Sequence, residues 1–292
     1  MPRGLLFILL VFITGAAAAQ PVYVSGGGGF ENLTIDTLKL GRSDDYYSLM
    51  HLNFFGVVEG DFDKNYSYKL SYQNDPFWQN TVKSDFGVRL GVIAVDFGVQ
   101  AGAHNSDSGY KVSDIEFWDL GVDGGVRLEF SGFFFTGFNF TLDIGGNAAN
   151  NKIGGAERQM IGFFGGFWLP NILISGNYYR KDYNEKINDA VSIHAAYSKI
   201  GFKMEFFAKN IFYRLALKAG TITQTCGAVS GNNSSDLSEN KHFYIGADFT
   251  VDLSRRLSWF INAEAPVLGL RAPIFMQFTA VSGVKFRCFE NR

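Results

Sequence analysis

The residues of this chain that could do chemistry are acids and bases placed at alternate positions of otherwise apolar segments. Asp85 and Arg89, for example, each stand between apolar or small neighbours, and the spacing recurs along most of the chain. Burying so many charges in a dry core would cost more free energy than their pairing returns, so we expect them to face water. They would line the lumen of a barrel, and the set is Lys69, Asp85, Arg89, Asp96, Asp119, Asp123, Arg127, Glu129, Lys203, Glu205, Arg214, Lys218, Asp248, Asp252 and Glu264.

Catalytic chemistry would have to use the four histidines. His51 and His194 fall at positions expected on the polar face, and His104 and His242 fall near loop ends. A serine or carboxylate beside a rim histidine could act as the nucleophile or base of a hydrolase. No spacing identifies such a pair, so we predict no catalytic site and keep an integral-membrane hydrolase as an alternative.

Metal and cofactor sites are not indicated either. No His or Cys cluster has the spacing of metal ligands. The glycine run Gly26–Gly29 is not followed by the helical pattern that a phosphate-binding loop requires. We therefore predict no metal and no cofactor, and the formal net charge of −2 gives no basic footprint for nucleic acid.

The elements that position the charges show a two-residue rhythm. Tyr66, Tyr68, Leu70 and Tyr72 alternate with polar neighbours from Ser67 onward. Successive side chains of a β-strand point to opposite faces, so this segment would have one apolar and one wet face. Nearly every candidate strand repeats the pattern with aromatic residues on the apolar side. This is typical of a barrel whose outside meets lipid and whose inside meets water.

Composition agrees with strands in a membrane. The chain has 292 residues with 30 Phe, 34 Gly and only 6 Pro, and Phe suits a pleated lipid-facing surface. Residues 1–19 are predicted to be a secretory signal peptide, with Arg3 before an apolar core and Ala17–Ala19 as the cleavage site. Residues 20–292 would then form one domain, exported and not anchored by helices.

Alternation and turn residues give fourteen candidate strands: 22–30, 50–59, 66–72, 85–92, 96–101, 118–129, 134–142, 161–169, 172–178, 191–197, 200–222, 243–251, 257–261 and 274–286. The parity of the outward residues flips near Ile93-Ala94, which predicts a tight turn there. Parity also shifts near Lys209-Asn210, so residues 200–222 are either two strands or one long bulged strand.

Connection lengths favour the single bulged strand. Short turns at Ser131-Gly132, Pro170-Asn171, Ser198-Lys199 and Ser254-Arg255 would alternate with long polar segments at 31–45, 104–114 and 223–240. Outer-membrane barrels have short periplasmic turns and long external loops. The predicted fold is an all-β, antiparallel up-and-down transmembrane β-barrel of about fourteen strands, with twelve as the alternative.

A water-soluble all-β protein would also show alternation, but its apolar rows would have to fill a core. Rows such as Phe134, Phe138 and Phe140, repeated over many strands, would overfill a small soluble barrel. The two cysteines, Cys226 and Cys288, would lie at opposite ends of a membrane barrel, too far apart for a disulfide.

The signal peptide, the alternating strands and a last strand containing Gly283 and Phe286 resemble bacterial outer-membrane β-barrel proteins over the whole mature chain. In that class the last strand resembles a polar-x-Gly-x-x-aromatic-x-apolar signal for the barrel-assembly machinery. Gly283 and Phe286 match it, whereas Val281 takes the polar place and the chain continues past Phe289. By size and strand count the chain looks most like monomeric porins.

This resemblance implies an outer-membrane location after export through the inner membrane, a monomeric state, and contact with outer-membrane lipid, the assembly machinery and small polar solutes. We expect a channel for passive diffusion of such solutes, tuned by the charges of its lumen. The charges could instead pair across the lumen and close it. The other alternative is a structural or adhesion barrel that binds a partner through the loops at 31–45 and 232–239.

Overall fold

The computed structural model describes eleven stretches of the chain: 22–36, 46–75, 79–104, 117–130, 132–148, 156–186, 191–207, 212–230, 233–234, 238–268 and 279–288. Their secondary structure consists of strands and short turns, and none of them holds a helix long and apolar enough to cross a bilayer. The strands are β1 (Val22–Asp36), β2 (Tyr46–Asp61), β3 (Tyr66–Asp75), β4 (Gln79–Leu90), β5 (Ile93–His104), β6 (Phe117–Phe130), β7 (Phe134–Ala148), β8 (Ala156–Leu169), β9 (Ile172–Lys186), β10 (Val191–Phe206), β11 (Tyr213–Ser230), β12 (Asn233–Ser234), β13 (Ser238–Asp252), β14 (Leu257–Leu268) and β15 (Thr279–Arg287).

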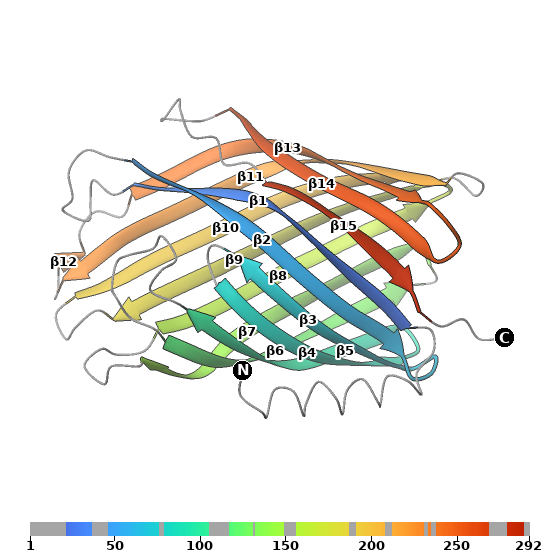
Figure 1. The fold of residues 1–292 in the computed structure, drawn as a ribbon, viewed down its shortest axis with the longest axis horizontal. Coiled ribbons are helices and arrows are strands. Elements are labelled where there is room, and N and C mark those ends of the chain that lie inside the picture. The colour runs from blue at the N-terminus through green and yellow to red at the C-terminus, as the bar shows by residue number, and fades with distance from the viewer. Residues whose placement is uncertain are drawn as a thin grey trace.

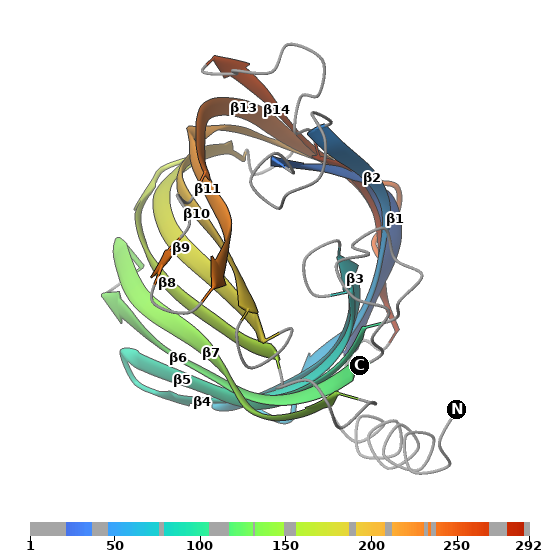
Figure 2. The same cartoon turned by 90° about the vertical axis from the view of Figure 1, so that its left-hand side faces the viewer.

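The strands form one closed antiparallel ring. Each main strand pairs with its neighbour in sequence, and β1 pairs with β15 to close the ring. β12 is a two-residue strand paired only with the end of β11, so fourteen strands make the wall. Figure 1 shows them running obliquely, and Figure 2 shows the ring from one end. The predicted fourteen-stranded barrel is confirmed, and the alternative of twelve strands is wrong.

The two faces of the wall carry the side chains that the alternation predicts. On β5, Val99 is 61% exposed on the outside, whereas the next residue, Gln100, is 3% exposed on the inside. Phe97 lies outside beside Val99 and is also exposed. A water-soluble barrel would need the reverse arrangement, because exposed apolar area is unfavourable in water. The exposed apolar band around the described wall is therefore a lipid-facing surface.

Aromatic rings collect on the outer face near the short-turn end. They touch from strand to strand, with centroids 6.0 Å apart for Tyr66 and Phe86, 5.1 Å for Phe134 and Phe167, and 6.2 Å for Tyr213 and Phe249. Rings of this kind form girdles at the membrane interfaces of barrels. In one part of this face, outward side chains are buried against each other and do not face the surroundings of the barrel. Val22 and Tyr68 flank Gly60 in the register, and both are buried.

Most predicted turns are confirmed. Pro170-Asn171 joins β8 to β9, residues 253–256 join β13 to β14, and Gly132 lies in the turn between β6 and β7. The turn placed at Ile93-Ala94 is instead at Gly91-Val92, because Gly91 adopts a φ of 62° that a side chain would disfavour.

The region after β9 corrects two predictions. Ser198-Lys199 is not a turn: it lies within the continuous strand β10. Residues 200–222 are not one bulged strand, because the chain turns between Phe206 and Tyr213. Aromatic residues of the candidate strands are expected on the outer face, but Tyr197 shares the inner face with Lys199, and its ring centroid lies 5.8 Å from that of Tyr179. A strand segment that extends beyond the hydrocarbon layer toward the loops need not have apolar residues on its outer face. Apolar side chains in such a segment therefore do not indicate which face is outside.

The longer connections all leave from one end, at the left of Figure 1, as predicted. They are shorter than predicted, because strands continue into the polar segments. β1 extends to Asp36, and β11 extends through Cys226 to Ser230. The remaining residues, 37–45 and 105–116 among them, lie outside the described residues, as do residues 1–19 and half of 232–239. Cys226 and Cys288 belong to opposite ends of the wall, and the Cys288 thiol is free.

The seam between the first and last strands is held from inside by two aromatic rings. Phe55 of β2, Gly27 of β1, Gly283 of β15 and Phe260 of β14 form one row across the register. The rings lean over the two glycines, where a Cβ would lie 2.9 Å from Phe55 and 2.7 Å from Phe260. Their centroids are 5.9 Å apart. The ring pair thus bridges the two strands that close the barrel.

We expect Phe55→Ala and Phe260→Ala to be coupled in a double-mutant cycle. The coupling in the free energy of unfolding, measured by urea titration in vesicles, should be about 0.5–1.5 kcal/mol, the range of an aromatic pair. Phe55→Ala combined with Tyr179→Ala, a ring on another part of the wall, should be additive. A zero coupling between Phe55 and Phe260 would contradict the bridge.

Candidate functional site: the charged inner wall

Two carboxylates converge on the inner face of β4–β6. Asp85, Gly98 and Asp123 are neighbours in the register, and a Cβ at Gly98 would meet an oxygen of each carboxylate. The Nζ of Lys83 lies 3.2 Å from Asp85 and 2.9 Å from Asp123. The Asp123 side chain is only 5% exposed. One lysine therefore compensates two acids at a point where they would otherwise repel each other.

A second group lies nearer the short-turn mouth. The Glu129 carboxylate forms ion pairs with two arginines: its oxygens lie 3.3 Å from Nη2 of Arg89 and 2.5 Å from Nη2 of Arg127. The Arg127 guanidinium also lies 4.8 Å from the centre of the Phe135 ring, which is buried on the inner face. A further ring on the inner face at this end is that of Trp168, whose centroid lies 6.2 Å from that of Phe135.

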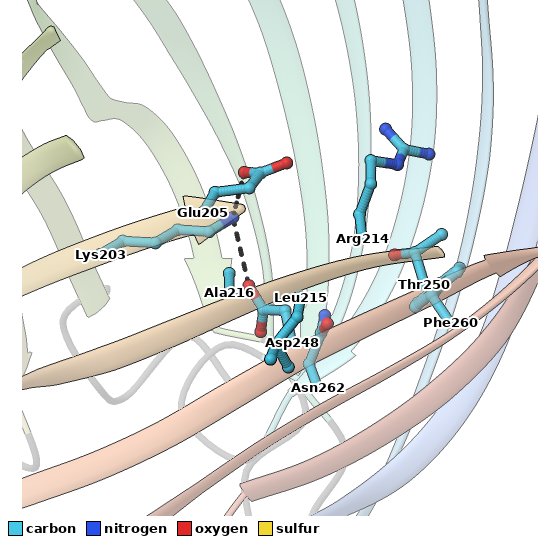
Figure 3. Close-up of a pocket in the computed structure, with 9 residues that line it drawn as sticks. All are labelled: Lys203, Glu205, Arg214, Leu215, Ala216, Asp248, Thr250, Phe260 and Asn262. Carbon is cyan, nitrogen blue, oxygen red and sulfur yellow. Dashed lines mark ion pairs between the residues drawn. The ribbon is translucent and has the colours of Figure 1, made fainter. Parts of the chain in front are cut away.

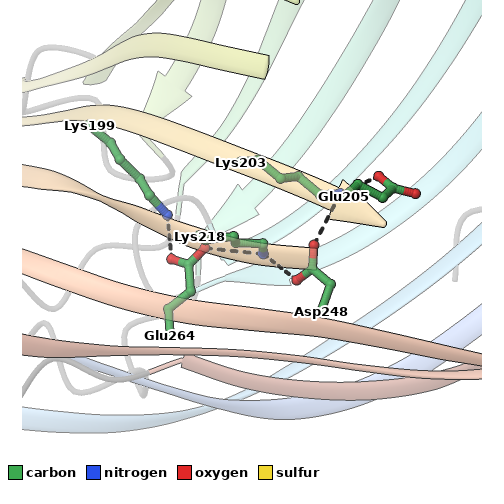
Figure 4. A network of polar contacts seen from close by, with 6 residues as sticks. All are labelled: Lys199, Lys203, Glu205, Lys218, Asp248 and Glu264. Carbon is green, nitrogen blue, oxygen red and sulfur yellow. Dashed lines mark hydrogen bonds and ion pairs between the residues drawn. The ribbon is translucent and has the colours of Figure 1, made fainter. Parts of the chain in front are cut away.

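The largest group crosses four strands, from β10 to β14, and Figure 4 shows it. We call it the β10–β14 ladder, and its members are Lys199, Lys203, Glu205, Lys218, Asp248 and Glu264. Lys218 is at its centre, paired with Asp248 and, at 3.3 Å, with Glu264.

The ends of the ladder extend along the wall. Lys199 pairs with Glu264, and Lys203 lies 3.2 Å from Asp248 and 3.1 Å from Glu205. Lys203 is directly opposite Lys218 in the register. Two adjacent cations would be unfavourable without the acids that separate them. The positions facing the acids across the strands, Ala216 and Gly246, are small and leave them room.

The structure places the described members of the predicted lumen set on the inner face, by the alternation of strands whose apolar residues are exposed outside. Most form ion pairs, including Arg214 and Asp252 at 3.9 Å. Lys69 and Asp96 are exposed on this face, with no ion pair to another described residue. The side chain of Asp119 lies outside the described residues.

Lys83, Lys199 and Lys285 are among the inward lysines that sequence reasoning missed. Lys83 lies two residues before Asp85, so continuing the alternation backwards would have found it. Lys199 was assigned to a turn. Lys285 of the last strand lies 2.7 Å from Glu59 and 4.6 Å from the ring of Tyr23, and the same alternation places it inside.

The ion pairs between described residues follow the wall and do not cross the barrel. Within the ladder, the ion pair that spans the most strands joins Lys199 of β10 to Glu264 of β14, and β11 and β13 lie between them in the wall. No ion pair between described residues joins the β3–β6 side to the β10–β14 side. The described pairs therefore do not close the lumen in the way that the alternative interpretation required.

The histidines that could support catalysis do not assemble a site in the described part of the chain. His242 is 1% exposed on the inner face of β13, and neither ring nitrogen has a hydrogen-bond partner. A histidine that acts as a general base lies within hydrogen-bond reach of the group whose proton it takes. The side chains of His51, His104 and His194 lie outside the described residues, and no described cluster of His, Cys, Asp and Glu could hold a metal ion.

The ladder borders two hollows in the wall. One, of about 270 Å³, lies between Lys203, Arg214 and Phe260, and Figure 3 shows its lining. The other, of about 310 Å³, lies between Phe164, Lys199 and Tyr244. Both volumes are at the small end for small-molecule sites.

No family model matches the chain, and no curated protein matches it. Its fold is similar to a loop-deletion mutant of OmpT, an outer membrane protein of Vibrio cholerae, at 9% identity and a TM-score of 0.42 over 91% of this chain and 98% of that one. The translocator domain of the autotransporter NalP from Neisseria meningitidis has 8% identity and a TM-score of 0.44 over 95% and 96%. Salmonella typhi OmpF, in complex with daunomycin, has 11% identity and a TM-score of 0.41 over 91% and 97%.

Closure of the ring, the exposed apolar outer face and the charged inner face define the class: a transmembrane β-barrel.

We expect Lys83→Met to lower the free energy of unfolding by about 2 kcal/mol, because it leaves two converging carboxylates without a cation. Urea titration of the refolded protein measures this loss. Adding Asp123→Asn should restore part of it. Lys69→Met, at an exposed inward lysine, should change stability by less than about 0.5 kcal/mol. Equal losses in the two lysine variants would refute the compensation.

Proposed function

We propose that this chain is a porin-like channel of the bacterial outer membrane, through which small polar solutes diffuse passively. One observation carries the proposal: a ring of fourteen strands has a charged inner face whose described ion pairs run along the wall. Small barrels are filled by their side chains, whereas wider ones leave room for water. Fixed charges around such a lumen tune passage by charge and size.

Several partners follow from this proposal. The exposed apolar face would contact outer-membrane lipid, and the barrel-assembly machinery would insert the protein after export through the inner membrane. Because the apolar band and the aromatic girdle occur on strands from both halves of the ring, we propose that one chain forms one pore. The proposal involves no enzyme activity, cofactor or nucleic acid.

Single-channel recording in planar bilayers tests the channel. The refolded chain should give discrete current steps, one step for each insertion because a monomer forms one pore. Steps that always arrive in groups of equal size would contradict the monomer. Electrical silence of a protein that shows heat-modifiable migration, and is therefore folded, would reject the channel itself.

Lys203→Gln should shift the reversal potential in a salt gradient toward cation selectivity, because it removes a positive charge from the lumen. Lys203→Glu should shift it about twice as far, since the change in charge is doubled. The matched control is Arg180→Gln, which removes an outward positive charge 2.8 Å from Asp182. Equal shifts in the inward and outward variants would show that the inner face does not border the conducting path.

A further inference from the structure

The hollow of about 310 Å³ on the inner wall combines two kinds of surface. Phe135 and Phe164, from β7 and β8, form its apolar side. Lys199, Tyr244 and Glu264, from β10, β13 and β14, form its polar side. A site with an aromatic side and a few convergent polar groups is the usual form of a small-molecule site.

Two glycines make room for the tyrosine ring that borders this hollow. Asn177, Gly201, Gly220 and Tyr244 form one row across β9, β10, β11 and β13. The Tyr244 ring lies flat over Gly220, where a Cβ would be 2.7 Å from its Cε1, and its hydroxyl lies over Gly201. The Nζ of Lys199 is 4.3 Å from the centre of this ring and holds it against the wall. A side chain at Gly220 would collide with this ring and one at Gly201 with its hydroxyl, so the two glycines allow the ring to take this position.

The charges that border the hollow are already paired. Its lining holds three lysines and two carboxylates of the β10–β14 ladder, and Lys203 is also paired with Glu205, which lies outside the lining. A solute ion would have to break one of these pairs or remain uncompensated in a partly buried place. A neutral hydroxyl can accept from an ammonium and donate to a carboxylate at the same time. The ladder therefore favours uncharged solutes with several hydroxyl groups.

We propose that this hollow binds a neutral polyhydroxylated solute of the size of a single sugar ring during its passage through the barrel. The carbon–hydrogen face of the ring would lie against Phe135 and Phe164, and its hydroxyls would meet Lys199, Glu264 and Asn177. This inference rests on the proposed channel and names the class of solute that the channel retains longest.

Current recordings with added sugar test the site. Glucose should block the open-channel current of the wild-type protein in a saturable way. Polyethylene glycol of the same hydrodynamic size should only reduce the current in proportion to its concentration. Glu264→Gln and Phe164→Ala should each raise the half-blocking glucose concentration roughly tenfold, because each removes part of the site. Tyr72→Ala, which removes a tyrosine ring from the outer face, should leave it unchanged.

The outcomes separate the two proposals. Current steps without saturable block by glucose in the wild-type protein would overturn the sugar site and leave the channel standing. Block that is unaffected by Glu264→Gln and Phe164→Ala, in variants that still conduct, would also overturn the site. Absence of any current from the folded wild-type protein would reject the channel and, with it, the site.

Discussion

The structure depends on backbone hydrogen bonds that close on themselves around a ring. Hydrocarbon offers no partner for an amide or a carbonyl, so a strand can cross it only when both of its edges are paired. Here β1 meets β15 and β10 meets β11, which leaves no main strand with a free edge. Once the ring is closed, the strand period of two divides the side chains into an outer and an inner set. The apolar outer face and the charged inner face are consequences of that division.

The inner face solves a second problem, the accumulation of charge on a narrow curved wall. Neighbouring strands place like charges side by side, such as Lys203 and Lys218, or Asp85 and Asp123 across Gly98. Oppositely charged residues on the same strand or on nearby strands compensate them within hydrogen-bond distance. Since this compensation runs along the wall, the described charges are compensated without pairing across the barrel. A water-filled lumen and a stable wall are therefore compatible.

The sequence predicted the fold because the constraint that dominates it is periodic. Outward Phe97 and Val99 beside inward Gln100 can be recognised from alternation alone. The failures occur where that constraint is weak. Around Tyr197 and Lys199 lipid no longer determines which side chains face outward. A turn was predicted inside β10, and the parity shift before Tyr213 was interpreted as a bulge although the chain turns there. These two errors cancelled, so the count of fourteen was correct although one boundary was wrong. The ladder pairs, such as Lys199 with Glu264, depend on register between distant strands, which no local pattern reveals.

The central claim is that the apolar row of each strand faces hydrocarbon and the polar row faces water. A cysteine scan through residues 69–73 of β3, in a variant with both native cysteines replaced by serine and reconstituted in liposomes, measures it directly. We predict a period of two: a charged, water-soluble thiol reagent should react rapidly at positions 69, 71 and 73 and slowly at positions 70 and 72. Uniform reactivity, or the reverse alternation, would contradict the account.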